Sequence, residues 1–387
     1  MSDNVSKFEP NPGRALRRRI LIFVLVFLLV AAIAALYVFR DRLNLDAARR
    51  FVRYLNVQTD KTGGSFTFDS HNANQYADMQ GGLVVASVSG LSVYESDGTE
   101  AAVVQAKMET PALRAGGKLA MAFDVGGNNL VAVTQTGTQV LNVSANRPIF
   151  DADCAADGSI CYASSESGYK TVLYVYDSSQ NMTYRWLSAS EYMPVCAISS
   201  GAKYLASVSL GQQDGMFESQ LHIFKTSTDE AGLTAGLGTD YIYDLTFMDG
   251  QTLCAVGETG VQWLDLQGNC LAEYTYDGEY LKDFDFGGDG FLSLIVNMYK
   301  AGNHYTVSTV DQTGTVLGSV QLDVQVLDFS AAGNYLAVLT AEKLCIYDNS
   351  MQLYFEQANT QNATNVLMRA DGSAVLLGGG SGEIVLP

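Results

Sequence analysis

A unit of about forty residues recurs along most of this chain, and this repeat constrains the fold more than any other feature. The two clearest copies read YDLTFMDGQTLCAVGETGVQWLDLQG from residue 243 and VLDFSAAGNYLAVLTAEKLCIYDNS from residue 326. Each copy has a first strand, a turn of small residues, a very apolar second strand and a third strand that ends before Asp. Alternating apolar and polar residues between Asp-Gly turns are typical of strands, so the repeated region is predicted to be all-β.

Eight units can be counted, with first strands that begin near residues 74, 110, 147, 191, 241, 280, 324 and 363. A four-stranded unit of this length cannot bury both of its faces alone, whereas units arranged around an axis cover one another. We therefore predict a β-propeller of eight four-stranded blades, or of seven if one weak early unit is misread. The last unit has only three strands, and Ser65–Asp69 is available as the fourth, which would close the ring without an open edge.

A run of twenty uncharged residues, Ile20 to Phe39, precedes the repeats. As a helix it would span about 30 Å, the thickness of the hydrocarbon core of a bilayer. The arginine cluster just before it favours a cytoplasmic N-terminus and an extracytoplasmic remainder, so we expect a single-pass protein of the plasma membrane. The alternative is a cleaved signal peptide with its cleavage site at residues 32–34, which would export the same region.

The domain organisation follows from these segments. Apolar residues between positions 41 and 56 recur every three or four residues, which is a helical period, and Gly63 and Gly64 end a short polar stretch. We expect the helix that contacts the lipid bilayer to continue outward as a stalk. The predicted parts are a basic cytoplasmic tail (1–19), a transmembrane helix (20–39), a helical stalk (40–57), a linker (58–64) and the propeller (65–387).

Charge divides the chain in the same place. Residues 1–59 carry ten Lys and Arg against four Asp and Glu, and the remainder carries 13 against 37. The negative field of the predicted exported part disfavours nucleic acid and anionic lipid surfaces, and it can attract cations or basic polymers. The same carboxylates are also explained as residues that keep an exported domain soluble.

The six cysteines do not have the spacing of a metal site. There is no Cys-x-x-Cys motif, and the three histidines are far apart in the sequence. Cys154 and Cys161 form the one plausible local disulfide, on strands joined by an Ala-Asp-Gly turn. The alternative is that these cysteines are small buried hydrophobic residues, because several of the six lie in apolar segments such as VCAI and LCIY.

Carboxylates are the remaining candidates for chemistry. Asp283 and Asp285 alternate on one strand and share a face, and Asp289 follows in the next turn, so the three are a candidate cation site or acid–base pair. Their spacing is not that of a calcium-binding loop. FDADCAADG, from residue 150, repeats the pattern, which favours a feature of the blades. No hydrolase motif or phosphate-binding loop is present, and we expect no cofactor.

Several blade segments carry a family resemblance, namely AMAFDVGG, NLVAVTQTG, AISSGAKYLASVS and FMDGQTLCAVGETGVQWLD. With the order of basic tail, apolar helix, stalk and propeller, they resemble an uncharacterised family, a domain of unknown function, of membrane-anchored exported propeller proteins of Gram-positive bacteria. The resemblance implies fold and topology but no catalytic residues. The strand ends LDLQG and IYDN are also similar to quinoprotein and WD-repeat propellers, although an Asp that accepts backbone N–H groups in a tight turn explains both.

Two functions from different classes remain. The first is a non-catalytic binding or scaffold module for a protein, peptide or cell-wall ligand, which predicts long aromatic loops on one face, such as those around 211–217 and 297–304. The second is a propeller enzyme, a lyase, hydrolase or quinoprotein, which predicts convergent acidic side chains with perturbed pKa values in the axial channel. We expect binding rather than catalysis.

Overall fold

The computed structural model describes residues 23, 50, 65–213, 215–360 and 362–387. The chain divides into two compact units, 1–53 and 54–387, and the description below concerns the second. Apart from Phe23 and Arg50, the predicted tail, transmembrane helix, stalk and linker lie outside the described residues. Within the described residues, no helix is both long enough and apolar enough to cross a membrane.

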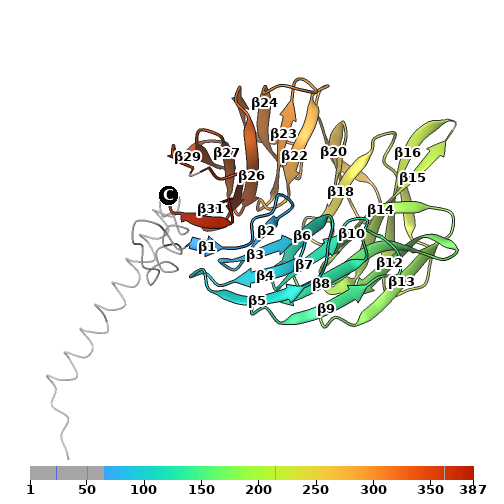
Figure 1. Cartoon of the computed structure of the whole chain (residues 1–387). Coiled ribbons are helices and arrows are strands. Elements are labelled where there is room, and N and C mark those ends of the chain that lie inside the picture. Colours follow the sequence, from blue (N-terminus) through green and yellow to red (C-terminus); the bar gives the residue numbers. More distant parts are fainter. Residues whose placement is uncertain (1–22, 24–49, 51–64, 214, 361) are drawn as a thin grey trace, which may run out of the picture. The chain divides into compact units, whose positions relative to one another are not determined.

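The described part of the second unit is an eight-bladed β-propeller, in which every blade is an antiparallel sheet of four strands (Figure 1). A short 3₁₀ helix, Ser200–Ala202, lies between β14 and β15. In chain order, blade 1 holds β2 (Gln75–Met79), β3 (Gly82–Ser87), β4 (Gly90–Tyr94) and β5 (Glu100–Gln105); blade 2 holds β6 (Pro111–Gly116), β7 (Leu119–Asp124), β8 (Asn129–Thr134) and β9 (Gln139–Ser144); blade 3 holds β10 (Ile149–Cys154), β11 (Ile160–Glu166), β12 (Tyr169–Tyr176) and β13 (Met182–Ser188); blade 4 holds β14 (Tyr192–Ile198), β15 (Tyr204–Gln213), β16 (Met216–Lys225) and β17 (Leu233–Gly236); blade 5 holds β18 (Ile242–Phe247), β19 (Leu253–Gly257), β20 (Gly260–Leu264) and β21 (Cys270–Thr275); blade 6 holds β22 (Tyr280–Asp285), β23 (Phe291–Asn297), β24 (Tyr305–Asp311) and β25 (Val316–Leu322); blade 7 holds β26 (Val326–Ala332), β27 (Tyr335–Thr340), β28 (Leu344–Asp348) and β29 (Leu353–Gln357); and blade 8 holds β30 (Asn365–Met368), β31 (Ala374–Gly378), β32 (Ser381–Val385) and β1 (Ser65–Thr67).

The hydrophobic cores lie between neighbouring blades. The second strands, such as β7, β23 and β27, are buried at every position, because both of their faces are covered. The outermost strands, such as β21, alternate between exposed and half-buried residues. In one core, Leu339 and Ile346 of blade 7 pack with Met368 and Leu376 of blade 8. The apolar runs of the sequence are therefore explained by packing of blade on blade.

The two ends of the propeller close the ring. Strand β1 pairs with β32, with Phe66 opposite Gly382, and the Phe66 ring is fully buried between blades 8 and 1. Arg369, which follows β30, adds polar links from blade 8 to blade 1. Its Nε lies 2.9 Å from Asp78 Oδ1, and its Nη2 donates to the Gly82 carbonyl at 3.2 Å. The predictions of eight blades and of closure by the residues ahead of the first unit are confirmed.

The Asp residues at the ends of the third strands close the following turns. In the β24–β25 turn, Asp311 Oδ1 accepts the N–H groups of Thr313 at 2.8 Å and Thr315 at 3.0 Å. Asp265, in the LDLQG segment, and Asp348, in IYDN, accept the N–H groups two and four residues further on in the same way. The explanation of these motifs as turn chemistry is confirmed.

Candidate functional site

Carboxylates on the first strands tie neighbouring blades together. On β10, Asp151 Oδ2 accepts the backbone N–H of Cys196 at 3.0 Å, and Asp153 Oδ2 accepts that of Ile198 at 2.9 Å. Both donors lie on β14, the first strand of the next blade. The strand period of two puts both carboxylates on one side of β10, where they meet alternate N–H groups of β14. We call such a bond an inter-blade rung.

The same rung occurs at two other blade interfaces. Between blades 6 and 7, Asp285 Oδ2 accepts the Ala331 N–H at 2.8 Å. Between blades 7 and 8, Asp328 Oδ2 accepts the Val366 N–H at 2.8 Å, and Ser330 Oγ accepts the Met368 N–H at 3.1 Å. A charge-assisted hydrogen bond to a backbone amide stabilises an interface that side-chain packing alone would leave free to slide.

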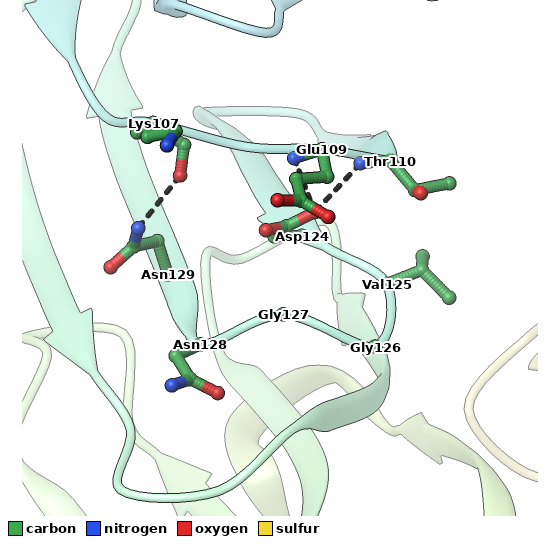
Figure 2. A pocket seen from close by; sticks show the side chains of 9 residues that line it. All are labelled: Lys107, Glu109, Thr110, Asp124, Val125, Gly126, Gly127, Asn128 and Asn129. Atoms are coloured by element: carbon green, nitrogen blue, oxygen red, sulfur yellow. Dashed lines mark hydrogen bonds between the residues drawn. The ribbon is translucent and has the colours of Figure 1, made fainter.

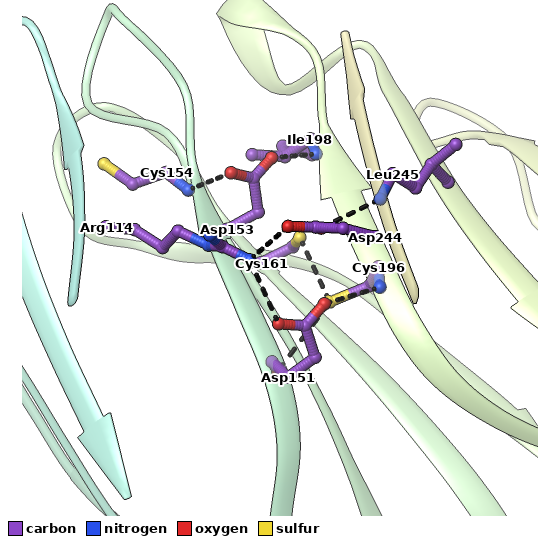
Figure 3. A network of polar contacts seen from close by, with 9 residues as sticks. All are labelled: Arg114, Asp151, Asp153, Cys154, Cys161, Cys196, Ile198, Asp244 and Leu245. Carbon is purple, nitrogen blue, oxygen red and sulfur yellow. Dashed lines mark hydrogen bonds and ion pairs between the residues drawn. The ribbon is translucent and has the colours of Figure 1, made fainter. Parts of the chain in front are cut away.

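An arginine joins blades that are not neighbours (Figure 3). Arg114 on β6 of blade 2 places Nη2 2.8 Å from Asp244 Oδ2 on β18 of blade 5, and 3.9 Å from Asp151 Oδ1. Blades 2 and 5 can meet only across the middle of the ring, so this ion pair lies near the axis of the propeller. The Arg114 side chain is 38% exposed, whereas those of Asp151 and Asp244 are 14% and 12% exposed. The middle of the ring therefore holds a partly exposed guanidinium and carboxylates that are largely shielded from water.

We call Arg114, Asp151, Asp153 and Asp244 the axial network. Burial raises the pKa values of two of its carboxyl groups. It raises the pKa of Asp151 to about 7, although Arg114 and the Cys196 N–H oppose the rise. It likewise raises the pKa of Asp153 to about 6, against the lowering effect of the Ile198 N–H and of Arg114. The pKa of Arg114 is raised, chiefly by the charge of Asp244. The network thus carries carboxyl groups that gain and lose protons near neutral pH.

Chemically, the axial network is built as a structural link. The carboxylates of Asp151 and Asp153 accept backbone N–H groups, and that of Asp244 holds Arg114 and accepts the Leu245 N–H. The convergence of acidic groups with raised pKa values is the feature that the enzyme hypothesis predicted. The hydrogen bonds and the ion pair that these oxygens make, in contrast, are those expected of a network that holds the blades together.

The three predicted carboxylates of blade 6 have separate environments. Asp285 forms the rung to blade 7 and accepts the Gly287 N–H at 2.7 Å, while Asp283 Oδ1 accepts the Phe284 N–H at 2.9 Å. Asp289 lies in the exposed turn that follows β22. Burial raises the pKa of Asp283 and of Asp285. Among the described residues, no group of three or more His, Cys, Asp or Glu side chains is arranged to hold a metal ion.

The cysteines are free thiols in the structure, and the predicted Cys154–Cys161 bridge is not formed. Asp153 is directly opposite Cys161 on the β10–β11 ladder, so Cys154, one residue on, points to the other face of the sheet. The two thiols accordingly belong to different cores. Cys161 instead lies at the interface with blade 4, where its Sγ is 3.6 Å from Cys196 Sγ.

A polar pocket of about 410 Å³ lies on blade 2 (Figure 2). The segment before β6 and the β7–β8 loop form its walls. Asp124 Oδ1 accepts the N–H groups of Glu109 and Thr110, each at 2.8 Å, and Asn129 Nδ2 donates to the Lys107 carbonyl at 2.7 Å. These bonds hold the two wall segments together. The lining residues are Lys107, Glu109, Thr110, Asp124, Val125, Gly126, Gly127, Asn128 and Asn129.

Exposed aromatic side chains gather where blades 4 and 5 meet. Tyr192 begins β14, Phe217 lies on β16, and Tyr241 and Tyr243 flank the start of β18. The ring centroids are 6.2 Å apart for Phe217 and Tyr241 and 5.3 Å apart for Tyr241 and Tyr243, whereas the Tyr192 ring lies 5.0 Å from that of Phe150 on blade 3. All four side chains are between 38% and 46% exposed. We call these four residues the aromatic rim.

The aromatic rim lies partly where the sequence predicted recognition loops. Residues 211–217 contribute Phe217, although most of this segment is β-structure, since β15 and β16 pair as far as Gln213 opposite Met216. The other predicted segment, 297–304, carries exposed Met298 and Tyr299 in blade 6. Sequence reasoning missed Tyr192, Tyr241 and Tyr243, which occupy first strands whose remaining residues are mostly buried. Their signal was an aromatic residue at the start of two successive first strands.

The fold and the surfaces described above define an eight-bladed β-propeller with an axial ion-pair network and an aromatic rim. Residues 53–378 match a family of unknown function, DUF5711, and the chain belongs to this family. No curated protein matches the chain.

Among solved structures, the propeller is similar to BamB from Moraxella catarrhalis, with 16% identity, coverage of 84% of this chain and 98% of that chain, and a TM-score of 0.52. It is also similar to the C-terminal WD40 domain of Sif2, with 12% identity, coverage of 79% and 93%, and a TM-score of 0.55. At these identities the similarity concerns the fold alone.

Proposed function

We propose that this protein is a non-catalytic binding or scaffold module for a protein, peptide or cell-wall ligand, and that the ligand docks on the aromatic rim. The observation that carries the proposal is the rim itself. Exposed apolar residues on a globular protein are usually scattered singly, whereas a contiguous exposed patch marks an interaction surface. Tyrosine and phenylalanine supply large contact areas with few rotatable bonds, and they are enriched at protein interfaces.

The location of this module is also a proposal, and it rests on the sequence. We infer that the apolar run from Ile20 to Phe39 anchors the chain in the plasma membrane, and that the arginines before it keep the N-terminus in the cytoplasm. Protease added to intact cells should then remove a propeller epitope and spare an N-terminal tag. Protection of both epitopes in intact cells would refute this topology.

Site-specific photo-crosslinking in intact cells tests the binding function. A photoreactive phenylalanine analogue in place of Phe217 should form a discrete adduct with the ligand, and the adduct should be lost in the Tyr241→Ala/Tyr243→Ala variant. The same analogue in place of Leu353, which is 54% exposed on the outermost strand of blade 7, is the matched control. An adduct of equal yield from position 353, or one that survives the double substitution, contradicts the proposal.

One observation favours the second candidate function, a propeller enzyme with an acidic axial site. Asp151 and Asp153 converge on Arg114 and have pKa values raised to about 7 and about 6 by burial, as in many acid–base sites. The backbone bonds of these carboxylates favour the structural function described above. If Asp153→Asn abolished turnover of a cell-wall fragment by a protein that remained folded, the enzyme would be the correct assignment.

A further inference from the structure

The chain around the aromatic rim is acidic over an unusually long stretch. From Thr226 to Leu281, which covers the end of blade 4 and all of blade 5, the sequence contains no Lys or Arg. The acidic residues in this stretch are Asp229, Glu230, Asp240, Asp244, Asp249, Glu258, Asp265, Glu273, Asp277 and Glu279. Of these, Asp244 is paired with Arg114, and Asp249 and Asp265 follow strand ends at the other end of blade 5 from Tyr241. A surface with one sign of charge attracts partners of the opposite sign and raises their rate of association.

Some of these carboxylates border the aromatic rings directly. Asp240 immediately precedes Tyr241, and the Glu258 N–H donates to the Tyr241 carbonyl at 2.9 Å. Burial, followed by the charges of Glu258 and Asp240, raises the pKa of Tyr243. On the blade 4 side, the strand period turns half-buried Glu218, the residue after Phe217, to the opposite face of β16, so the carboxylates that border the rim are those of Asp240 and Glu258. The rim thus presents ring faces and carboxylates within the reach of a single ligand side chain.

The backbone beside the rim offers a second mode of contact. The last pair between β14 and β15 is Tyr192 with Leu210, and the last pair between β16 and β17 is Gln220 with Gly236. The β15–β16 hairpin continues beyond both neighbours to its tip, where residues 211–213 and 216–218 pair in described ladders only with each other (Figure 1). Strand edges of this kind can accept an extended peptide as an added strand.

We propose that the aromatic rim binds an extended, lysine- or arginine-containing peptide segment of a partner protein, an inference that rests on the proposed binding function and specifies its ligand. The cationic side chains stack on the tyrosine and phenylalanine faces, where the ring quadrupole attracts them, and Asp240 and Glu258 pair with their charge. The peptide backbone lies along the hairpin edge. The protein already contains one such contact, because Lys300 Nζ lies 5.5 Å from the centroid of the exposed Tyr280 ring.

Fluorescence anisotropy with defined peptides tests this inference on the full-length chain in non-ionic detergent. Three labelled peptides of equal length and apolar content carry lysine, glutamine or glutamate at the same positions. We expect the lysine peptide to bind about tenfold more tightly than the glutamine peptide, and the difference to shrink as salt is added. The Asp240→Asn/Glu258→Gln variant should weaken binding of the lysine peptide about three- to tenfold and leave the glutamine peptide unchanged.

The controls separate this inference from the binding function on which it rests. Glu342→Gln, an exposed carboxylate of blade 7, should have no effect. Equal affinities for the three peptides, or an unchanged affinity in the Asp240→Asn/Glu258→Gln variant, would overturn the cationic ligand while leaving the photo-crosslinking result at Phe217 intact. If photo-crosslinking at Phe217 also gives no adduct, the binding function itself fails.

Discussion

Replacing Arg114 with methionine should destabilise the propeller, and the loss should depend on pH. Methionine keeps much of the apolar stem and removes the charge that faces Asp244 at 2.8 Å and Asp151 at 3.9 Å. Removing one partner of a buried ion pair costs about 3–5 kcal/mol, because the other charge stays buried without compensation. Since Arg114 is 38% exposed and water screens part of the interaction, we expect a loss of about 2–3 kcal/mol at pH 8.

The sign of the pH dependence follows from the raised carboxyl pKa values. Asp151 and Asp153 have folded-state pKa values of about 7 and about 6, above the ordinary 3.8, so the folded protein binds protons more tightly than the unfolded chain. Each such group makes the protein more stable as pH falls from its folded pKa towards its unfolded one, by up to about 1.4 kcal/mol per pH unit. At pH 5 Asp151 and Asp153 are largely neutral, so the part of the Arg114 contribution that comes from these two charges is lost, and the cost of losing Arg114 should be smaller at pH 5 than at pH 8.

Urea unfolding of the full-length protein at pH 5 and pH 8, followed by the fluorescence of Trp186 and Trp263, measures this effect as a shift of the midpoint. Arg185→Met is the matched control. Arg185 pairs with Glu166 on the surface of blade 3 and is 37% exposed, so its loss should cost less than about 1 kcal/mol at either pH. The reasoning is refuted if the two variants lose equal stability, or if Arg114→Met loses as much at pH 5 as at pH 8.

Three further predictions concern the closure, a turn and the thiols. Phe66→Ala should cost about 3–5 kcal/mol by opening a cavity between blades 8 and 1, and thermal unfolding would show it; a loss below 1 kcal/mol would mean that β1 does not hold the ring closed. Asp311→Ala should speed amide exchange at Thr313 and Thr315, because it removes the acceptor of both N–H groups. We expect a loss of about 1 kcal/mol in the local stability of this turn. The Thr313 hydroxyl and both N–H groups lower the pKa of Asp311, so this contribution is lost in acid, and unchanged exchange would contradict it. Exposed Cys270 should react with iodoacetamide in the native protein before the five buried thiols, as mass spectrometry of the labelled protein would show; early labelling of Cys161 would indicate that the interface of blades 3 and 4 opens.

The fold was predictable because its determinants are local and repeated. A buried second strand such as β27 appears in the sequence as an apolar run, and an Asp at the end of a third strand, such as Asp348, predicts the turn that follows. Closure was predictable by elimination, since the last unit has three strands and Ser65–Asp69, which contains β1, was left over. Each of these features can be predicted from the sequence of one repeat, or from the first and last segments of the propeller.

The candidate site was less predictable because its contacts join units that are far apart in the sequence. Arg114 and Asp244 are separated by 130 residues, and no pattern within blade 2 or blade 5 indicates that they meet. The register of one hairpin bears on the two alternatives for Cys154, a disulfide with Cys161 or a buried free thiol. A disulfide across a short turn requires both side chains to share a face of the hairpin, and the register places Asp153, not Cys154, opposite Cys161.

Aspartates in corresponding parts of the first strands show why the sequence of a blade does not determine its chemistry. Asp151 and Asp328 each accept an N–H group from the next blade, whereas Asp244 accepts that of Leu245 on its own strand and holds Arg114 from across the ring. In the first two cases the neighbouring strand satisfies the carboxylate. In the third, a cation on a distant blade does so, and its effect reaches the pKa of Asp151 on blade 3. Exchanging the blade 5 strand for that of blade 7 keeps an Asp at this position, because Asp244 and Asp328 are both third in their strands, and should therefore preserve the fold and the ion pair with Arg114.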